Sequence, residues 1–196
     1  MGLIPRFYDV QEGEVLVDGV NVKDYDRRTL RRKIGYVPQK ALLFKGTIME
    51  NIRFGDDSAS DERVKEAAAI AQSTDFIEDK PDGFDSSISQ GGSNVSGLAI
   101  ARAIVRKPEI YVFDDSFSAL DFKTDSALRQ ALSKETGNAT VVIVAQRVST
   151  IMNADRIIVM DEGKVMGIGT HRELLNTCGT YQEIVRSQLS EEEMSA

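Results

Sequence analysis

The sequence is poor in the residues that build disulfide-stabilised and zinc-binding proteins. Its 196 residues include one cysteine, one histidine and no tryptophan. One cysteine cannot form a disulfide within the chain and is too few for a cysteine-rich zinc site, and it fits a reducing compartment. These absences exclude small disulfide-stabilised secreted domains and zinc-finger proteins as classes for this chain.

Long hydrophobic runs are also missing. The longest, Ala67–Ala71 and Val141–Ala145, contain five residues each, whereas a helix that crosses a bilayer needs about 20 apolar residues. Pro5 and Arg6 interrupt the start of the chain too early for a signal peptide. We therefore expect a cytosolic domain without a membrane span.

Positive charge is scarce relative to negative charge. Lysine and arginine number 24 against 31 acidic residues, which gives a net charge of −7. A protein that binds nucleic acid by broad charge attraction has the opposite balance, so we expect no nucleic acid partner. A local basic cluster nevertheless lies within 27–33, and its favoured interpretation is a solvated helix face, with an anion site as the alternative.

The hydrophobic pattern predicts an α/β fold. Hydrophobic residues make up 41% of the chain, enough for a folded core. Short strands, with a hairpin around Asp18-Gly19, are expected in the first forty residues, then helices, then a loop at 80–97. Three apolar runs are predicted to be buried strands separated by helices: Ile110–Phe113, Thr140–Ala145 and Arg156–Met160. This alternation favours a mostly parallel sheet.

The strongest local feature is a pair of carboxylates at a strand end. Asp114 and Asp115 directly follow the run 110–113, and ligands bind at the carboxyl ends of parallel strands. A carboxylate there can hold Mg²⁺ beside nucleotide phosphates, directly or through water. The alternative is that the two residues only cap the next turn.

Three other motifs are weak when each is taken alone. Gln39 follows a predicted strand, as many polar loop residues do. The glycine-rich segment 91–97 precedes a helix, where it could present backbone N–H groups to an anion or serve as a linker. The sequence Ser-Ala-Leu-Asp at 118–121 is ordinary loop composition.

Together, in this order and spacing, the motifs resemble the nucleotide-binding domain of an ABC (ATP-binding cassette) transporter of the exporter type. The matching positions are Gln39 in the Q-loop, Ser96-Gly97 in the signature motif, Ile110–Asp114 in Walker B and Ser118–Asp121 in the D-loop. The resemblance covers residues 3 to about 190. It implies a P-loop NTPase-like α/β core with a mostly parallel sheet, an antiparallel β subdomain and an α-helical subdomain.

The resemblance also implies a division of the chain. Residues 1–190 would form the nucleotide-binding domain, and 191–196 a charged tail. The expected parts of the domain are a partial β subdomain and core at 1–38, the Q-loop and α-helical subdomain at 39–106, and the Walker B, D-loop and switch core at 107–190.

The family's cofactors are ATP and Mg²⁺, and the resemblance assigns roles at the phosphates. Asp114 would hold Mg²⁺, and Gln39 would reach the metal and relay its state to the membrane domain. Asp115 would orient the attacking water weakly, and Gln146 would contact the γ-phosphate. Hydrolysis in this family uses positioning and electrostatics rather than a covalent intermediate.

Further roles follow from the family's sandwich dimer, in which ATP lies between the Walker A loop of one subunit and the signature motif of the other. Asp121 would act across the dimer interface, and Ser96 and Gly97 would serve the partner's ATP. The implied partners are a second nucleotide-binding domain and a transmembrane domain, contacted through its coupling helices. The implied location is the cytoplasmic face of a membrane.

The sequence departs from the family pattern at four places. No G-x-x-x-x-G-K-[S/T] loop occurs, and Gly97 runs directly into Leu98 where the signature motif should continue. Asp115 stands where the family has a catalytic Glu, and Gln146 where it has a switch His that can titrate near neutral pH. The two substitutions are typical of a degenerate ATP site, whereas the two gaps look like excised segments.

These departures predict little or no ATP hydrolysis by this chain alone. Three interpretations stay open: an ATPase, a module that binds ATP with a partner but hydrolyses it poorly, and a remnant that binds no nucleotide by itself. It is also open whether the two segments are deleted from the protein or are loops that are left out only because they are not ordered.

Overall fold

A computed structural model describes residues 1–88, 95–118 and 120–188. The chain divides into two compact units, Met1–Val144 and Ala145–Ala196. Each unit is described by itself. Within the described residues, no helix combines the length and hydrophobicity needed to cross a membrane.

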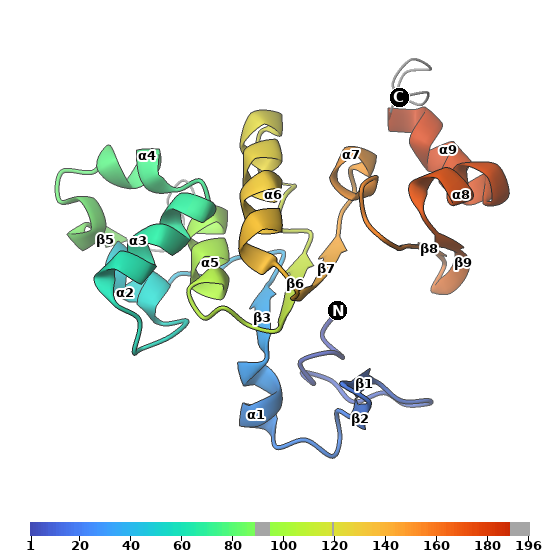
Figure 1. Ribbon diagram of the computed structural model, residues 1–196, viewed down its shortest axis with the longest axis horizontal. Coiled ribbons are helices and arrows are strands. Elements are labelled where there is room, and N and C mark those ends of the chain that lie inside the picture. Colours follow the sequence, from blue (N-terminus) through green and yellow to red (C-terminus); the bar gives the residue numbers. More distant parts are fainter. Residues whose placement is uncertain (89–94, 119, 189–196) are drawn as a thin grey trace. The chain divides into compact units, whose positions relative to one another are not determined.

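A parallel sheet forms the centre of the first unit (Figure 1). Its strands are β3 (Ile34–Val37), β6 (Ile110–Asp114) and β7 (Thr140–Val144), in the order β3-β6-β7. Both pairings are parallel, and Ile34 lies opposite Ile110 in the register of β3 with β6. The predicted α/β fold with a parallel sheet is therefore confirmed.

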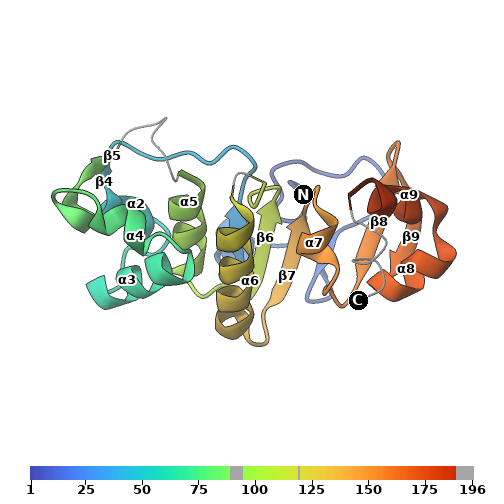
Figure 2. The ribbon, with the colours of Figure 1, turned by 90° about the horizontal axis from the view of Figure 1, so that it is seen from above.

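Strand β6 is buried on both faces, as its unbroken apolar sequence predicts. Tyr111 and Phe113 belong to the large cluster that includes the helices. Val112 belongs to a smaller cluster with residues of the N-terminal segment. The sheet thus separates a helical layer from the layer formed by residues 1–32, and Figure 2 shows α6 beside β6 and β7.

The N-terminal layer contains β1 (Leu16–Val17), β2 (Val20–Asn21) and α1 (Arg27–Arg32). β1 and β2 form the predicted hairpin, with Asp18 and Gly19 at positive φ in its turn. The Asp26 side chain accepts hydrogen bonds from two backbone N–H groups of α1, which fixes where the helix begins.

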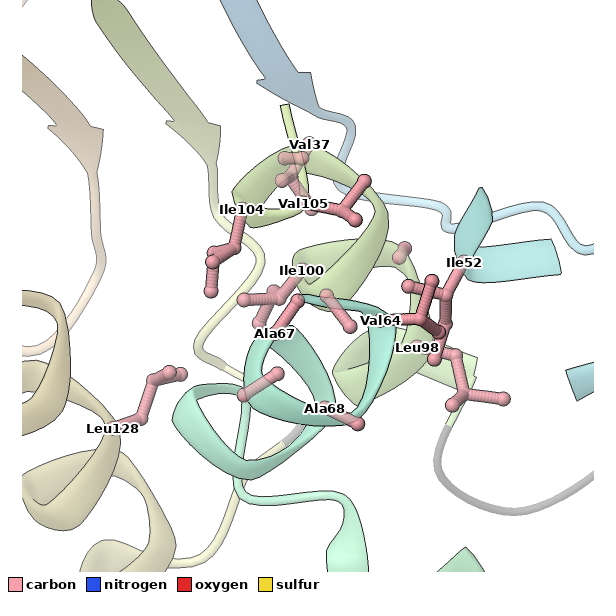
Figure 3. Packing of buried hydrophobic residues seen from close by; sticks show 14 of the residues in the cluster. Val37, Ile52, Val64, Ala67, Ala68, Leu98, Ile100, Ile104, Val105 and Leu128 are labelled. Carbon is pink, nitrogen blue, oxygen red and sulfur yellow. The ribbon is translucent and has the colours of Figure 1, made fainter. Parts of the chain in front are cut away.

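The helical layer is built from short, capped helices around α5. Its elements are β4 (Gly46–Thr47), α2 (Ile48–Arg53), α3 (Asp61–Ile70), α4 (Thr74–Glu78), the 3-10 turn η1 (Gly83–Asp85), β5 (Ser87–Ile88), α5 (Val95–Ile104) and α6 (Phe122–Thr136). A capping box at Thr47 and Glu50 starts α2, and the Ser60 side chain caps α3. In Figure 3, Ala67 and Ala68 of α3 lie close to α5, whose Ile100 is fully buried.

Close packing in this layer depends on one glycine. A Cβ added to Gly55 would lie 2.0 Å from the carbonyl oxygen of Arg102 and 2.8 Å from Cγ1 of Val105. Since neither backbone nor a packed methyl group can yield that far, glycine lets the segment after α2 approach the end of α5.

The second unit contains α7 (Val148–Ile151), β8 (Ile157–Asp161), β9 (Lys164–Gly169), α8 (His171–Thr177) and α9 (Gly179–Gln188). β8 and β9 form an antiparallel hairpin with a register shift at Val159/Met160. A capping box of Thr170 and Glu173 begins α8.

Several predicted elements differ from the structure. Ser96 and Gly97, predicted to lie in a loop, lie in the first turn of α5, which continues through Leu98. Residues 89–94 of that predicted loop lie outside the described residues. The prediction of buried strands was wrong for β7 and β8. Val141 is 38% exposed, and among the described residues β7 pairs with β6 alone. Met160 is 60% exposed because only alternate residues of β8 pack inward.

Candidate nucleotide site at the carboxyl ends of β3 and β6

Two side chains meet where β3 and β6 end. The hydroxyl of Tyr36, on β3, donates a hydrogen bond of 2.8 Å to Oδ2 of Asp114, the last residue of β6. Burial and this carboxylate together raise the pKa of Tyr36 to about 12. The bond orients the Asp114 carboxylate.

A second pair links the residues just beyond the same strands. The Nε2 atom of Gln39 donates a hydrogen bond of 3.0 Å to Oδ2 of Asp115. Gln39 is exposed, whereas Asp115 is 7% exposed. The parallel register of β3 with β6 brings the two side chains together, as expected for strand ends at one edge of a sheet.

The backbone around Asp115 is held from several directions. Asp115 has a φ of 51°, in the left-handed region that side-chain-bearing residues seldom adopt. Its N–H donates to the carbonyl of Val144 at 3.0 Å, and its carbonyl accepts from the Ser118 hydroxyl at 2.8 Å. The Ser116 hydroxyl donates to the carbonyl of Val37 at 3.3 Å. These contacts position the carboxylate pair on rigid elements rather than on a free loop.

The remaining predicted site residues lie elsewhere. Asp121 caps α6: its carboxylate accepts from the backbone N–H and the hydroxyl of Thr124, and these bonds lower the pKa of Asp121. Ser96 and Gly97 are in α5, and Gln146 belongs to the second unit. The structure therefore places Gln39, Asp114 and Asp115 at the ends of neighbouring strands, and the predicted roles of all seven residues stay predictions.

The donor atoms at the strand ends suit Mg²⁺ with a nucleotide. Asp114, Asp115 and Gln39 supply only oxygen donors for a hard cation, which commonly binds one or two carboxylates together with substrate phosphates and water. Among the described residues, no group of three or more His, Cys, Asp or Glu side chains could hold a metal ion by itself. The arrangement thus fits Mg²⁺ that arrives with phosphates.

An exposed aromatic patch follows Gln39 in the chain. Leu42, Phe44 and Phe54 are 59%, 47% and 61% exposed, and the two phenylalanine rings are 4.4 Å apart. Arg102 of α5 lies over both rings and donates to the carbonyls of Leu42 and Asn51. Burial lowers the pKa of Arg102. Large exposed apolar groups held this firmly are typical of an interaction surface.

Comparison with known proteins identifies the family. The family model described as ABC transporter matches residues 1–118. The chain therefore belongs to the ABC transporter family.

Individual relatives agree with this assignment. An uncharacterized ABC transporter ATP-binding protein of Mycobacterium tuberculosis is 45% identical over 196 aligned residues, covering 96% of this chain and 33% of the relative. A Staphylococcus aureus protein that carries the name of a multidrug export ATP-binding/permease protein is 42% identical over 193, with the same coverage. The solved structure of a bacterial Atm1-family ABC exporter with ATP bound has a TM-score of 0.92 and 36% identity, covering 97% of this chain and 34% of that one. The chain spans about one third of the length of these relatives.

Two residues at these sites were missed by sequence reasoning. The sequence gives Tyr36 no sign of a role beyond membership of a strand. Residues 110, 112 and 114 of β6 share one face of the sheet, and the parallel register places Tyr36 beside them. Arg102 was read as part of a helix. Its position over the Phe44 and Phe54 rings depends on the packing of α5 against α2, which no local pattern reveals.

Proposed function

We propose that this chain is the ATP-binding domain of an ABC exporter and couples ATP binding and hydrolysis to export across a membrane. The hydrogen bond between Gln39 and Asp115 carries the proposal, because it joins the loop after β3 to the carboxylate pair expected at the γ-phosphate. Asp114 and Gln39 would hold Mg²⁺, which when bound neutralises charge on the phosphates. Tyr36 orients Asp114 for that task.

The same loop supports a transmembrane domain as partner. Gln39 is followed within five residues by Leu42 and Phe44 of the aromatic patch. A movement of Gln39 when nucleotide binds would therefore shift the patch through a short backbone segment. We place the coupling helices of the transmembrane domain on this patch, which would locate the chain at the cytoplasmic face of a membrane.

The proposal includes an impaired catalytic site. The Asp115 side chain is one methylene shorter than Glu and already accepts the amide of Gln39, so it would hold an attacking water poorly. Gln146 can hydrogen-bond a phosphate but cannot titrate near neutral pH. No residues of this chain supply a G-x-x-x-x-G-K-[S/T] cradle for the β- and γ-phosphates. We therefore expect its role to be binding in a dimer rather than turnover.

Association with a second nucleotide-binding domain tests the proposal. The chain is mixed with an exporter ATP-binding domain that has an intact Walker A loop, and sedimentation velocity is measured with and without MgATP. A mixed dimer should form only with MgATP. Ser96→Ala should weaken it by about tenfold, the effect of losing one hydrogen bond to a charged phosphate.

Ser187→Ala is the matched control, because the Ser187 hydroxyl donates only to the carbonyl of Ile184 in α9 among the contacts of the described residues. This variant should form the mixed dimer as the unaltered chain does. Absence of any ATP-dependent association would instead support a remnant that does not bind nucleotide.

A further inference from the structure

The basic cluster around α1 is a second place where the molecule could bind a charged ligand. Four arginines of α1 and one that follows α5 line one hollow of about 250 Å³. They are Arg27, Arg28, Arg31, Arg32 and Arg106. Five positive charges therefore gather at one concave place on a chain whose net charge is −7.

Within the described part of the chain, acidic residues only partly neutralise these arginines: Asp9 attracts Arg27, Asp26 attracts Arg28 and Asp56 attracts Arg106. None of the five forms an ion pair there, whereas the adjacent Lys33 pairs with Asp18 at 3.0 Å and with Glu109 at 2.6 Å. The nearby Asp9 is already paired with Arg6, and Asp26 caps α1. The flanking acidic residues that favoured a solvated helix face thus have other partners.

The cluster is also unfavourable for α1 itself. Arg27 and Arg31 are four residues apart, and so are Arg28 and Arg32, a spacing at which like charges repel on a helix. Arg31 and Arg32 gain something from the negative end of the helix dipole, but Arg27 and Arg28 lie at its positive end. An anion in the hollow would relieve the repulsion of all four.

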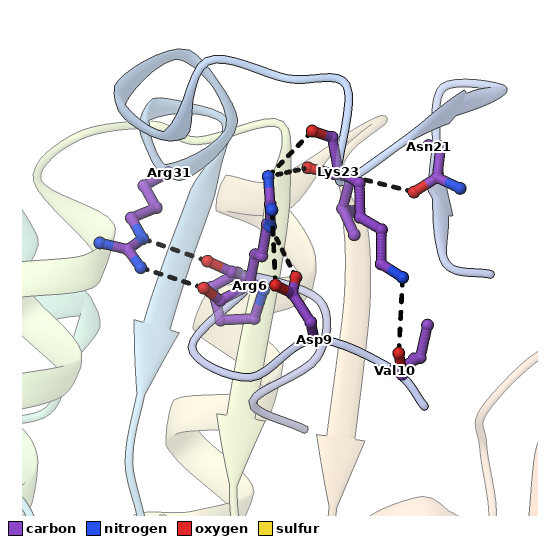
Figure 4. Close-up of polar contacts among 8 residues, drawn as sticks. Arg6, Asp9, Val10, Asn21, Lys23 and Arg31 are labelled. Atoms are coloured by element: carbon purple, nitrogen blue, oxygen red, sulfur yellow. Dashed lines mark hydrogen bonds and ion pairs between the residues drawn. The ribbon is translucent and has the colours of Figure 1, made fainter. Parts of the chain in front are cut away.

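Two of the guanidinium groups are held in place before any ligand binds. Arg31 donates to the carbonyls of Pro5 and Arg6 at 3.1 Å each and lies over the Phe7 ring, as Figure 4 shows for the two carbonyl contacts. Arg106 donates to the carbonyl of Arg32 at 3.2 Å. Each guanidinium has five N–H donors, so both keep donors for a ligand. Preorganised forks of this kind favour phosphate over a diffuse charge partner.

The hollow is distinct from the candidate nucleotide site. α1 ends just before β3 begins, and Arg106 precedes β6. Gln39 and Asp115 follow the carboxyl ends of the same two strands. Because β3 and β6 are parallel, the arginines lie at the opposite end of the sheet, and Figure 1 shows α1 at the start of β3.

We propose that this hollow binds a soluble anion with several phosphate groups, such as a polyphosphate, independently of the nucleotide site. The stems of five arginine side chains line this hollow, and their charges gathered around one small hollow suit a compact anion better than a flat lipid surface. The other arginines of α1 would attract the anion by their charge. Arg31 and Arg106, whose guanidinium groups are held in place, would orient it.

Tripolyphosphate, titrated into the 196-residue protein by calorimetry without divalent metal and with a chelator, tests the proposal. The unaltered chain should bind it, and affinity should fall as salt rises. The triple variant Arg27→Gln, Arg28→Gln, Arg32→Gln should bind at least about tenfold more weakly, because three charge-assisted contacts are lost. The matched control replaces Arg156, Arg172 and Arg186 of the second unit by Gln, which removes the same charge, and its affinity should not change.

Two further comparisons decide the remaining outcomes. The double variant Arg31→Lys, Arg106→Lys keeps the charge but removes the two positioned planar forks, so it should bind more weakly than the unaltered chain. An unchanged affinity would overturn the proposal even where the glutamine variant does not fold. Equal losses in the glutamine variant and its control would also overturn it. So would binding to polyglutamate as tight as to tripolyphosphate, or binding to phosphatidylglycerol vesicles without binding to tripolyphosphate.

Discussion

The hydrogen bond from Tyr36 to Asp114 couples a strand residue to the carboxylate at the centre of the candidate site. Replacing Tyr36 by Phe removes the donor while keeping the ring that packs edge-on against Phe7. Near pH 8 the variant should be less stable by about 0.5–1.5 kcal/mol, the net contribution of one such hydrogen bond. Urea unfolding measures the difference, and Tyr8→Phe, a change at a ring that is 74% exposed, should stay within about 0.5 kcal/mol.

The pH dependence of this difference is a second readout of the same variant. The pKa of Tyr36 is raised to about 12 in the folded chain, whereas a tyrosine in an unfolded chain titrates near 10. The unfolded chain therefore loses this proton first, so the contribution is complete below about pH 10 and is lost as the pH rises through the folded value. The stability gap between the two proteins should narrow over that interval, and parallel curves would show that burial and the Asp114 carboxylate do not raise the pKa of Tyr36.

At the scale of elements, Arg63 joins three helices. From α3 it donates to the carbonyls of Ile104 and Val105 at the end of α5, at 2.6 and 3.2 Å. It also pairs with Glu135 of α6 and with Glu66 of its own helix, both at 2.7 Å. The two glutamates differ in exposure, since the side chain of Glu135 is 13% exposed and that of Glu66 is 53% exposed.

This difference in burial predicts different costs for the same chemical change. Glu135→Gln should destabilise the chain by about 1–3 kcal/mol, because it leaves the charge of Arg63 poorly compensated in a buried place. Glu66→Gln should cost no more than about 1 kcal/mol, as for an exposed ion pair. Thermal unfolding of both variants compares them directly, and equal costs would mean that burial does not set the strength of these pairs.

Elements with local signals could be predicted from the sequence. Ser60 and the Thr170–Glu173 capping box fix helix starts through contacts three residues away, and the apolar run of β6 reports its burial. The course of Ser96 and Gly97 could not be predicted this way, because glycine and serine favour loops locally while Leu98 and Ile100 bury the helix that contains them. The burial of β7 could not be predicted either. Its apolar sequence suits a strand with two neighbours, but within the described residues it pairs with β6 alone.

For the candidate site, the sequence alone placed Gln39 and the pair Asp114 and Asp115 each after a predicted strand, but did not indicate which strands are neighbours or which atoms pair. Gln39 and Asp115 come together because two segments 76 residues apart are in parallel register. The donor to Asp114, Tyr36, was not foreseen, since a tyrosine within an apolar strand has no local mark of a polar contact. The expected roles of Gln39 and Asp115 at Mg²⁺ and the phosphates came from the family resemblance, because neither residue indicates such a role alone.

At the scale of the whole chain, we expect ATP affinity to depend on the balance between the oxygen donors at the strand ends and the phosphate contacts that these 196 residues supply. Asp114, Asp115 and Gln39 offer a place for Mg²⁺, but carboxylates repel phosphates unless a metal lies between them. The backbone nest and lysine of a P-loop supply several charge-assisted contacts, each contributing about 1.5–3 kcal/mol. Loss of two or more such contacts should lower ATP affinity at least about a hundredfold relative to an intact ATP-binding domain.

Calorimetry on the 196-residue chain with MgATP measures this affinity, with an intact exporter ATP-binding domain as reference. We expect weak binding to the chain alone, no measurable hydrolysis, and ATP-dependent association with the reference domain. These results together would describe a module that needs its partner. The weak binding that remains should depend on Mg²⁺ and should fall further in Asp114→Asn, since that carboxylate is the expected metal ligand. Affinity equal to that of the reference domain would contradict the argument, because the remaining donors would then have to replace a complete phosphate loop.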